Sequence, residues 1–403
     1  METEYGFSLF GSVLKRGYDL DRITFSNLKE GLCLKERIQS AAKLFEKMIE
    51  RGVRPNAITC GTIITGLVSA GELDHAVELL RKMVKQNCEA NIVCYGMIID
   101  ELCKRGSVEE AMNVFSEMLD DSNIVPNVIV YSSLINGLCS SGRVGEAVRV
   151  FDSMSSRGVS ANIYTYTSLI NGLCRRGLWK EAIRYYNEMV GIGISPSVVT
   201  FNVLIDSLSK QGKVEEASKI FDEMIKIRTE PDVYTYNSLM LGLCSTGKIE
   251  EARRLFDSMT GKGLEQNDYS FNLLINGYCK RSRLDEAIQL FRKMQKMGLK
   301  PDQVTYNTLL DGLCKAGKVT TALTMFSEMQ SYGVSPDIVT YNALMIGLCK
   351  AGNTEKAREL FFELPKKGLS ADVVSYTTII NGLCKEGMLI EAEKLINEMK
   401  NKG

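Results

Sequence analysis

Small hydrogen-bonding side chains return at a fixed spacing along this chain. The spacing is 35 residues. In the repeat from Val198 to Asp232, the fifth position is Asn202 and the last is Asp232. Amide and carboxylate groups supply hydrogen-bond donors and acceptors to a flat polar partner. Residues of this kind suit recognition by hydrogen bonding.

Both positions keep to a narrow chemical set. The fifth position holds Ser26, Gly61, Gly96, Ser132, Thr167, Asn202, Asn237, Asn272, Asn307, Asn342 and Thr377. The last position holds Asn56, Asn91, Asn127, Asn162, Ser197, Asp232, Asn267, Asp302, Asp337 and Asp372. Helix caps and turns explain each residue taken singly. However, Asn and Asp occur together in four of the last five complete repeats, and capping alone does not require this pairing.

Two further positions could complete a binding surface. The second position holds Ile23, Ile58, Val93, Ile129, Tyr164, Val199, Tyr234, Tyr269, Val304, Val339 and Val374. Such residues could pack as staples at a helix entrance, or form a wall on which a nucleobase stacks. The thirteenth position holds the cations Lys104, Arg175, Lys210, Lys280, Lys315, Lys350 and Lys385. They could compensate a helix C-terminus or contact a phosphate backbone.

The elements that position these residues are predicted to be paired helices. Apolar residues at helical spacing indicate one helix from Val198 to Lys210 and another from Val214 to Ile225, with Gly212 as the cap between them. Alanine marks the same place in eleven successive repeats: Ala41, Ala76, Ala111, Ala147, Ala182, Ala217, Ala252, Ala287, Ala322, Ala357 and Ala392. One extra residue near Asp120 to Pro126 breaks the register. A fixed period this short predicts an all-α solenoid whose units stack on one another, with no sheet.

The repeats fill the chain. Residues 1–21 correspond to the second half of a partial repeat, residues 22–372 to ten complete repeats, and residues 373–403 to most of an eleventh. Nothing outside the array is left for a catalytic domain. We therefore expect function to reside in the positions that vary between repeats.

Composition excludes several classes of protein. The 403 residues include 49 basic and 49 acidic ones, so the formal net charge is zero and any basic groove must be local. No apolar run is long enough to span a membrane. The first residues resemble neither a secretion signal nor a transit peptide, so this end does not reveal localisation.

The twelve cysteines are interpreted as packing residues. Nine share one position near the end of the first helix: Cys33, Cys103, Cys139, Cys174, Cys244, Cys279, Cys314, Cys349 and Cys384. With His75 as the only histidine and no CxxC motif, no metal site or other cofactor is expected. We expect free thiols in a reducing compartment.

The repeat beginning at Val304, VTYNTLLDGLCKAGKVTTALTMFSEMQSYGVSPD, closely resembles the pentatricopeptide repeat of the pure 35-residue class (P class). The recurring LINGLC and GLCKAG phrases are most similar to the fertility-restorer-like branch of plant organelles. The resemblance implies a right-handed superhelical solenoid of helix-turn-helix repeats that binds single-stranded RNA, one base per repeat. It also implies that fifth and last positions bond the base, that second positions sandwich it, and that RNA runs 5′ to 3′ from the N- to the C-terminus.

The resemblance further implies a base order. Asn with Asp implies uracil, Asn237 with Asn267 a pyrimidine with cytosine preferred, and Ser with Asn adenine. Thr167 with Ser197 is interpreted as purine, whereas Gly61 and Gly96 predict permissive repeats. The expected site is 5′-ANNARUCUUU-3′. By the same resemblance we expect a role in organellar RNA processing, stability or translation, in mitochondria or alternatively chloroplasts. A separate nuclease or processing protein is a possible partner, and no membrane or small-molecule substrate is expected.

Two other classes of function are alternatives to RNA binding. A protein-binding scaffold of the tetratricopeptide kind has a 34-residue period and a different signature. An enzyme would need catalytic residues, and no Walker loop, HExxH, GxSxG or dinucleotide fingerprint is present. Acidic pairs such as Glu109 with Glu110, or Glu215 with Glu216, are expected on exposed faces of second helices. RNA binding ranks first, the scaffold second and the enzyme third.

Overall fold

The structure is a computed structural model that describes residues 57–85, 91–120 and 124–402, together with Ile38, Ala42 and Glu46. The predicted partial repeat at 1–21 lies outside the described residues. So do most of the first complete repeat and the segment 121–123, which is part of the stretch from Asp120 to Pro126 in which the extra residue is expected. The helical ranges below therefore belong to the second and later repeats.

Helices occupy most of the described chain, and no β-strand occurs in it. The first unit, residues 1–204, contains α4 Ala57–Ala70, α5 Leu73–Lys85, α6 Ile92–Lys104, α7 Val108–Asp120, α8 Val128–Ser140, α9 Val144–Ser156, α10 Ile163–Arg175 and α11 Trp179–Gly191. The division between the units falls within α12 Val198–Lys210. The second unit contains α13 Val214–Lys226, α14 Val233–Ser245, α15 Ile249–Gly261, α16 Asp268–Lys280, α17 Leu284–Lys296, α18 Gln303–Lys315, α19 Val319–Ser331, α20 Ile338–Lys350, α21 Thr354–Glu363, the short 3₁₀ helix Pro365–Lys367, α22 Val373–Lys385 and α23 Leu389–Lys402.

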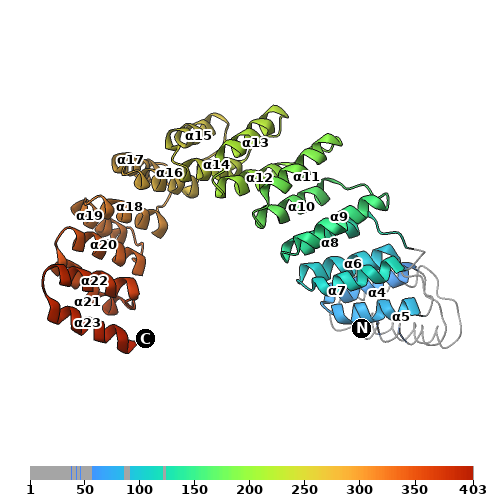
Figure 1. The fold of residues 1–403 in the computed structure, drawn as a ribbon, viewed down its shortest axis with the longest axis horizontal. Coiled ribbons are helices and arrows are strands. Elements are labelled where there is room, and N and C mark those ends of the chain that lie inside the picture. The colour runs from blue at the N-terminus through green and yellow to red at the C-terminus, as the bar shows by residue number, and fades with distance from the viewer. Residues whose placement is uncertain are drawn as a thin grey trace, which may run out of the picture. The chain divides into compact units, whose positions relative to one another are not determined.

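Each unit is a stack of helix pairs (Figure 1). The first helices of neighbouring repeats pack on one another, as α6, α8 and α10 do in the first unit and α18, α20 and α22 in the second. Within each unit, second helices pack on the first helix of their own repeat and on that of the next, as α7 does with α6 and α8 and α19 does with α18 and α20. The predicted fold class, an all-α solenoid of stacked helix-turn-helix repeats, is confirmed.

Shared faces form the core of each stack. The predicted alanine column is almost completely buried, with Ala252 and Ala287 at 0% exposure. In the second helices from α7 to α21, an aromatic residue meets, edge to face, the aromatic at the fourth position of the next repeat, as Phe291 and Tyr306 do at 5.3 Å between ring centroids. Such pairs contribute about 0.5–1.5 kcal/mol beyond area burial. The core residues therefore pack between neighbouring repeats as well as within each repeat.

The cysteine position supports the packing interpretation. A Cβ on Gly137 of α8 would lie 2.4 Å from Cys103 Sγ of α6, which is too close for any side chain. Gly347 and Cys314 repeat this close approach in the second unit. Burial raises the pKa of Cys139 to about 12, so the thiol stays protonated and is a poor metal ligand. Cys384 departs from the prediction because its side chain is exposed, with no described first helix after α22 to cover it.

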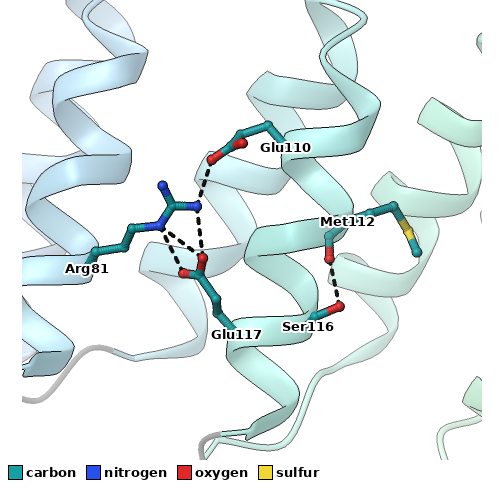
Figure 2. Close-up of polar contacts among 5 residues, drawn as sticks. All are labelled: Arg81, Glu110, Met112, Ser116 and Glu117. Carbon is teal, nitrogen blue, oxygen red and sulfur yellow. Dashed lines mark hydrogen bonds and ion pairs between the residues drawn. The ribbon is translucent and has the colours of Figure 1, made fainter.

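Ion pairs connect successive second helices at the surface. Figure 2 shows Arg81 of α5 between Glu110 and Glu117 of α7, with Nη2 2.7 Å from a Glu110 oxygen and 2.8 Å from a Glu117 oxygen. Lys248 reaches back to Glu215 of the preceding repeat in the same manner, at 2.7 Å. These acidic residues thus make surface ion pairs of second helices, as expected for solvated faces.

Candidate functional site

The fifth and last positions converge because first helices stack. The last residue of each complete repeat from Asn91 onward directly precedes a first helix, and several of these residues cap that helix with their side chains. The fifth residue lies one turn into the preceding first helix, on the side that faces this cap. An N-cap side chain accepts from orphan backbone N–H groups, and a carboxylate there is favoured by the helix dipole. The last-position residue can therefore cap the following helix and also bond the fifth-position side chain of its own repeat.

Asn307 of α18 shows the arrangement most completely. Its Nδ2 donates to Asp337 Oδ1 at 3.1 Å, and its Oδ1 accepts from Thr340 Oγ1 at 2.6 Å. A carboxylate can only accept, so the amide nitrogen must face Asp337. An amide has two N–H donors and two oxygen lone pairs, which leaves one of each available. Asn307, which is half-buried, thus holds an unused donor beside an unused acceptor.

Asp337 and Asp372 are held ionised by their surroundings. Burial alone would raise the pKa of Asp337, but hydrogen bonds from the Thr340 backbone, the Thr340 hydroxyl and the Asn307 amide together outweigh it. The pKa is consequently lowered from its ordinary value of 3.8. Asp372 behaves alike, and Asn342 Nδ2 donates to its two oxygens at 3.1 and 3.2 Å. Both carboxylates are acceptors at neutral pH.

The Asn–Asn repeat is held less firmly at the last position. Asn237 Nδ2 lies 3.5 Å from Asn267 Oδ1, at the limit of a hydrogen bond. Its Oδ1 accepts from Ser270 Oγ at 2.7 Å. A last-position Asn can offer either an oxygen or a nitrogen, so it does not impose one orientation on its partner. This repeat therefore differs in geometry from the Asn–Asp repeats.

Other predicted pairs show related contacts. Thr305 Oγ1 lies 2.7 Å from Asn272 Oδ1 and 2.8 Å from Asp302 Oδ1. In the first unit, Ser132 Oγ lies 2.7 Å from Thr165 Oγ1, and Thr167 Oγ1 lies 2.8 Å from Thr200 Oγ1. Asn202 is half-buried in α12, and Asp232 caps α14 with Oδ1 2.8 Å from the Thr235 N–H. Thr377 of α22 is exposed and bonds the carbonyls of its own helix.

The two glycine repeats have a different cap. Asn91 Oδ1 accepts from the N–H groups of Val93 and Cys94 at 3.1 Å each. Asn127 does the same with Ile129 and Val130, also at 3.1 Å. Gly61 and Gly96 bring no side chain to these caps, so the predicted absence of a base-reading group there agrees with the geometry.

The second position forms an exposed apolar column. Every described side chain at this position is between 47% and 74% exposed, although all are large and apolar or aromatic. They are Val93, Ile129, Tyr164, Val199, Tyr234, Tyr269, Val304, Val339 and Val374. A packing staple would be buried, so this observation disfavours the staple interpretation.

The thirteenth-position cations divide into two groups. Lys104, Lys210 and Lys315 pair with the aspartate four residues earlier, at 2.6 to 2.7 Å. Arg175, Lys280, Lys350 and Lys385 are exposed, and none makes an ion pair within the described part of the chain. Exposed pairs of this type contribute little stability, so the paired lysines remain available at small cost.

Residues outside the described part of the chain leave some predictions without a structural account. Ser26, Asn56 and Ile23 are outside it, and the side chain of Ile58 is not described. Sequence reasoning also missed a set of residues, the Ser and Thr at the third position. A signal was present: that position is Cys94 and Val130 only where the preceding fifth position is glycine.

The described residues contain no group of three or more His, Cys, Asp or Glu able to hold a metal ion. Of the helices within the same described ranges, none is long and apolar enough to cross a membrane. Neither finding alters the arrangement of the four positions.

Stacked helix pairs of 35 residues, with polar fifth and last positions meeting between repeats, define the chain as a helical-repeat solenoid. The profile of the PPR repeat family matches it eleven times, at residues 30–69, 55–104, 90–140, 126–175, 166–210, 196–245, 231–280, 266–315, 301–350, 336–385 and 371–403. The chain belongs to the PPR repeat family. No curated protein matches it significantly.

Solved structures are similar in fold. The pentatricopeptide repeat protein PPR10 from maize matches with a TM-score of 0.51 and 22% identity, over 100% of this chain and 66% of that one. PPR10 in complex with an 18-nt psaJ RNA element matches with a TM-score of 0.50 and 24% identity, over 98% of this chain and 65% of that one. This chain thus spans slightly less than two thirds of those chains. At these identities the likeness shows the fold alone.

Proposed function

We propose that this protein binds single-stranded RNA sequence-specifically, with one base per repeat. The observation that carries the proposal is the Asn307 amide, held at both ends and left with one donor and one acceptor. Membership of the PPR repeat family supports it, as does the similarity in fold to PPR10, which was solved with RNA.

The four positions divide the work. Exposed second-position residues such as Val304 and Val339 supply walls for a base, a contact that is worth about 1–3 kcal/mol per base on aromatic walls and less on aliphatic ones. Fifth-position side chains bond the base edge, and thirteenth-position cations meet phosphates. Uracil presents an N3–H donor beside a carbonyl acceptor, which complements the acceptor and donor left on Asn307. The proposed site is 5′-ANNARUCUUU-3′, aligned from the N- to the C-terminal repeats.

Charge supports a local electrostatic contribution. The chain as a whole is neutral, but Lys280 and Lys350 stand exposed at the ends of first helices without a carboxylate partner in the described residues. Acidic residues such as Glu110 and Glu215 are engaged by cations of neighbouring repeats on the second helices. In organelles such binding would protect, process or expose a transcript, with any cleavage supplied by a separate nuclease. The resemblance to the fertility-restorer-like branch leads us to propose mitochondria as the location, with chloroplasts as the alternative.

The test compares the affinity of the protein for three RNAs. Fluorescently labelled 5′-AGGAGUCUUU-3′ is measured as single-stranded RNA, as duplex RNA and as a single strand with the last five bases shuffled. We expect tight binding to the first alone, because a duplex hides the base edges and a shuffle misplaces cytosine. Equal affinity for all three would contradict sequence-specific binding. Absence of binding to any would favour a protein-binding scaffold.

A further inference from the structure

A buried hydroxyl touches the fifth-position side chain in six described pairs of repeats. The hydroxyl belongs to the third position of the following repeat, and the oxygen-to-oxygen distances are 2.6 to 2.8 Å. The pairs are Ser132 with Thr165, Thr167 with Thr200, Asn237 with Ser270, Asn272 with Thr305, Asn307 with Thr340, and Asn342 with Ser375. All six third-position residues are 0% exposed.

Capping alone does not explain these hydroxyls. The first helices α6 and α8 are capped by Asn91 and Asn127 although their third positions are Cys94 and Val130. A helix start in this chain therefore does not require Ser or Thr there. The two helices that lack the hydroxyl are the two that follow Gly61 and Gly96, which have no side chain to hold. The hydroxyl thus accompanies the fifth-position side chain and not the cap.

The geometry at Thr340 shows what the hydroxyl does. Asp337 Oδ1 already accepts from the Thr340 N–H at 2.8 Å and from the Asn307 amide at 3.1 Å. The hydroxyl oxygen accepts from the Asp337 N–H at 3.1 Å and has a single proton to give. Two acceptors are within reach of that proton, Asn307 Oδ1 at 2.6 Å and Asp337 Oδ1 at 2.8 Å. The contact to Asn307 is the shorter one, and Asp337 Oδ1 already has two other donors. The hydroxyl proton therefore fixes the oxygen end of the amide whose nitrogen end the carboxylate fixes.

We propose that the third-position hydroxyls are positioning residues for base recognition, each of which sets the orientation of the fifth-position side chain in the preceding repeat. This proposal rests on the proposed RNA binding. A fixed amide oxygen can accept from uracil N3–H, whereas cytosine offers an acceptor at N3 and a donor at N4, and needs the amide reversed. An amide held at one end can rotate between both arrangements. In the Asn–Asp repeats the hydroxyl and the carboxylate together thus separate uracil from cytosine. Asn237 has only a 3.5 Å contact at its nitrogen end, so its amide is held firmly at one end alone and can turn toward cytosine.

The dependence on the hydroxyl differs between repeats. Asn307 retains its bond to Asp337 when the hydroxyl is removed. Asn237 retains only the 3.5 Å contact to Asn267, so Ser270 is its main tether. Removal of the Ser270 hydroxyl should therefore disturb base preference at its repeat more than removal of the Thr340 hydroxyl does at the Asn307 repeat.

The loss-of-function test uses Thr340→Val, which keeps the shape of the side chain and removes the hydroxyl. Affinity is measured for RNAs that carry uracil or cytosine opposite the Asn307 repeat, and separately opposite the Asn342 repeat. We expect the uracil-to-cytosine ratio to fall about fivefold at the first position and to stay unchanged at the second. Thr340→Ser should restore the ratio. If Thr340→Val lowers affinity for both bases by one common factor, the hydroxyl is only a cap and the proposal fails.

A gain-of-function test uses the Gly61 repeat. A Cβ at Gly61 meets nothing within 4 Å, and Cys94→Ser is nearly isosteric. Gly61→Asn alone should give a weak pyrimidine preference at its base, and addition of Cys94→Ser should strengthen it about fivefold. Equal preference in the single and double variants would overturn the proposal. Absence of any base preference in the unaltered protein would instead contradict the proposed function, so the two failures are distinguishable.

Discussion

Removal of three thirteenth-position cations should weaken RNA binding without changing which sequence is preferred. The variant combines Lys280→Ala, Lys315→Ala and Lys350→Ala at the ends of α16, α18 and α20. Lys280 and Lys350 have no ion-pair partner within the described residues, whereas Lys315 Nζ lies 2.6 Å from Asp311 Oδ2. Two full contributions and one partial contribution are therefore expected.

The magnitude follows from counterion release. Each phosphate contact on a single strand adds about 0.7 to the slope of log affinity against log salt. The unpaired lysines thus account for about 1.4, and Lys315 adds up to about 0.7 more. Between 50 and 200 mM salt, three full contacts would weaken the unaltered protein by about twentyfold, a loss that the variant should largely escape.

Fluorescence anisotropy over a salt series measures this slope. The matched control replaces Lys226, Lys262 and Lys296, which are exposed and belong to second helices or their C-terminal caps. We expect the control to retain the slope of the unaltered protein. An unchanged slope in the first-helix variant, or a loss confined to one RNA sequence, would show that these lysines do not face phosphate.

Four further outcomes are expected. Asn307→Thr with Asp337 kept should move the preference of that repeat from uracil to guanine, and a retained uracil preference in competition binding would show the register to be wrong. Ser282 has a φ of 57°, so Ser282→Gly should raise stability by about 1 kcal/mol in urea unfolding, and an unchanged midpoint would argue against strain there. The buried Tyr306 hydroxyl has no hydrogen-bond partner among the described residues, so Tyr306→Phe should leave thermal stability equal or higher. Tyr166→Phe instead loses a 2.8 Å bond to Glu188 and should lower stability by about 1 kcal/mol. The pKa of Asp337 is lowered in the folded protein, so its carboxylate stays ionised at any pH above the ordinary value of 3.8, and its hydrogen bonds are lost only as the pH falls through the lower folded value. Base selectivity measured between pH 5 and pH 8 should therefore be constant.

Periodicity predicted the helices well because the residues that end each helix, such as the capping glycine, recur at the same position in most repeats. The helix expected from Val198 to Lys210 has those bounds, and the one expected from Val214 ends at Lys226, one residue beyond the predicted Ile225. Gly212 adopts the left-handed conformation, with a φ of 71°. Glycine, alanine and apolar spacing report local geometry directly, so the sequence was sufficient for these features.

The candidate site was only partly predictable. The pairing of fifth and last positions was visible because both vary together along the chain. The third-position hydroxyl was missed because Thr three residues after an Asp is typical of a capping box, and the box is present at Thr340. Its second contact crosses to Asn307 of the preceding repeat, and only the stacking of α18 on α20 brings those atoms together. The pairing of Lys315 with Asp311 likewise depends on rotamers that sequence does not specify.

Selection from a pool of randomised single-stranded RNA tests the central claim most directly. The predicted result is enrichment of one ordered motif that ends in U-C-U-U-U at its 3′ side. Adenines are expected five and two bases before the first of these uracils, with two permissive positions between the adenines and a purine directly before that uracil. Recovery of the reversed order, or of no sequence above background while the protein remains folded, would contradict one-base-per-repeat recognition by this chain.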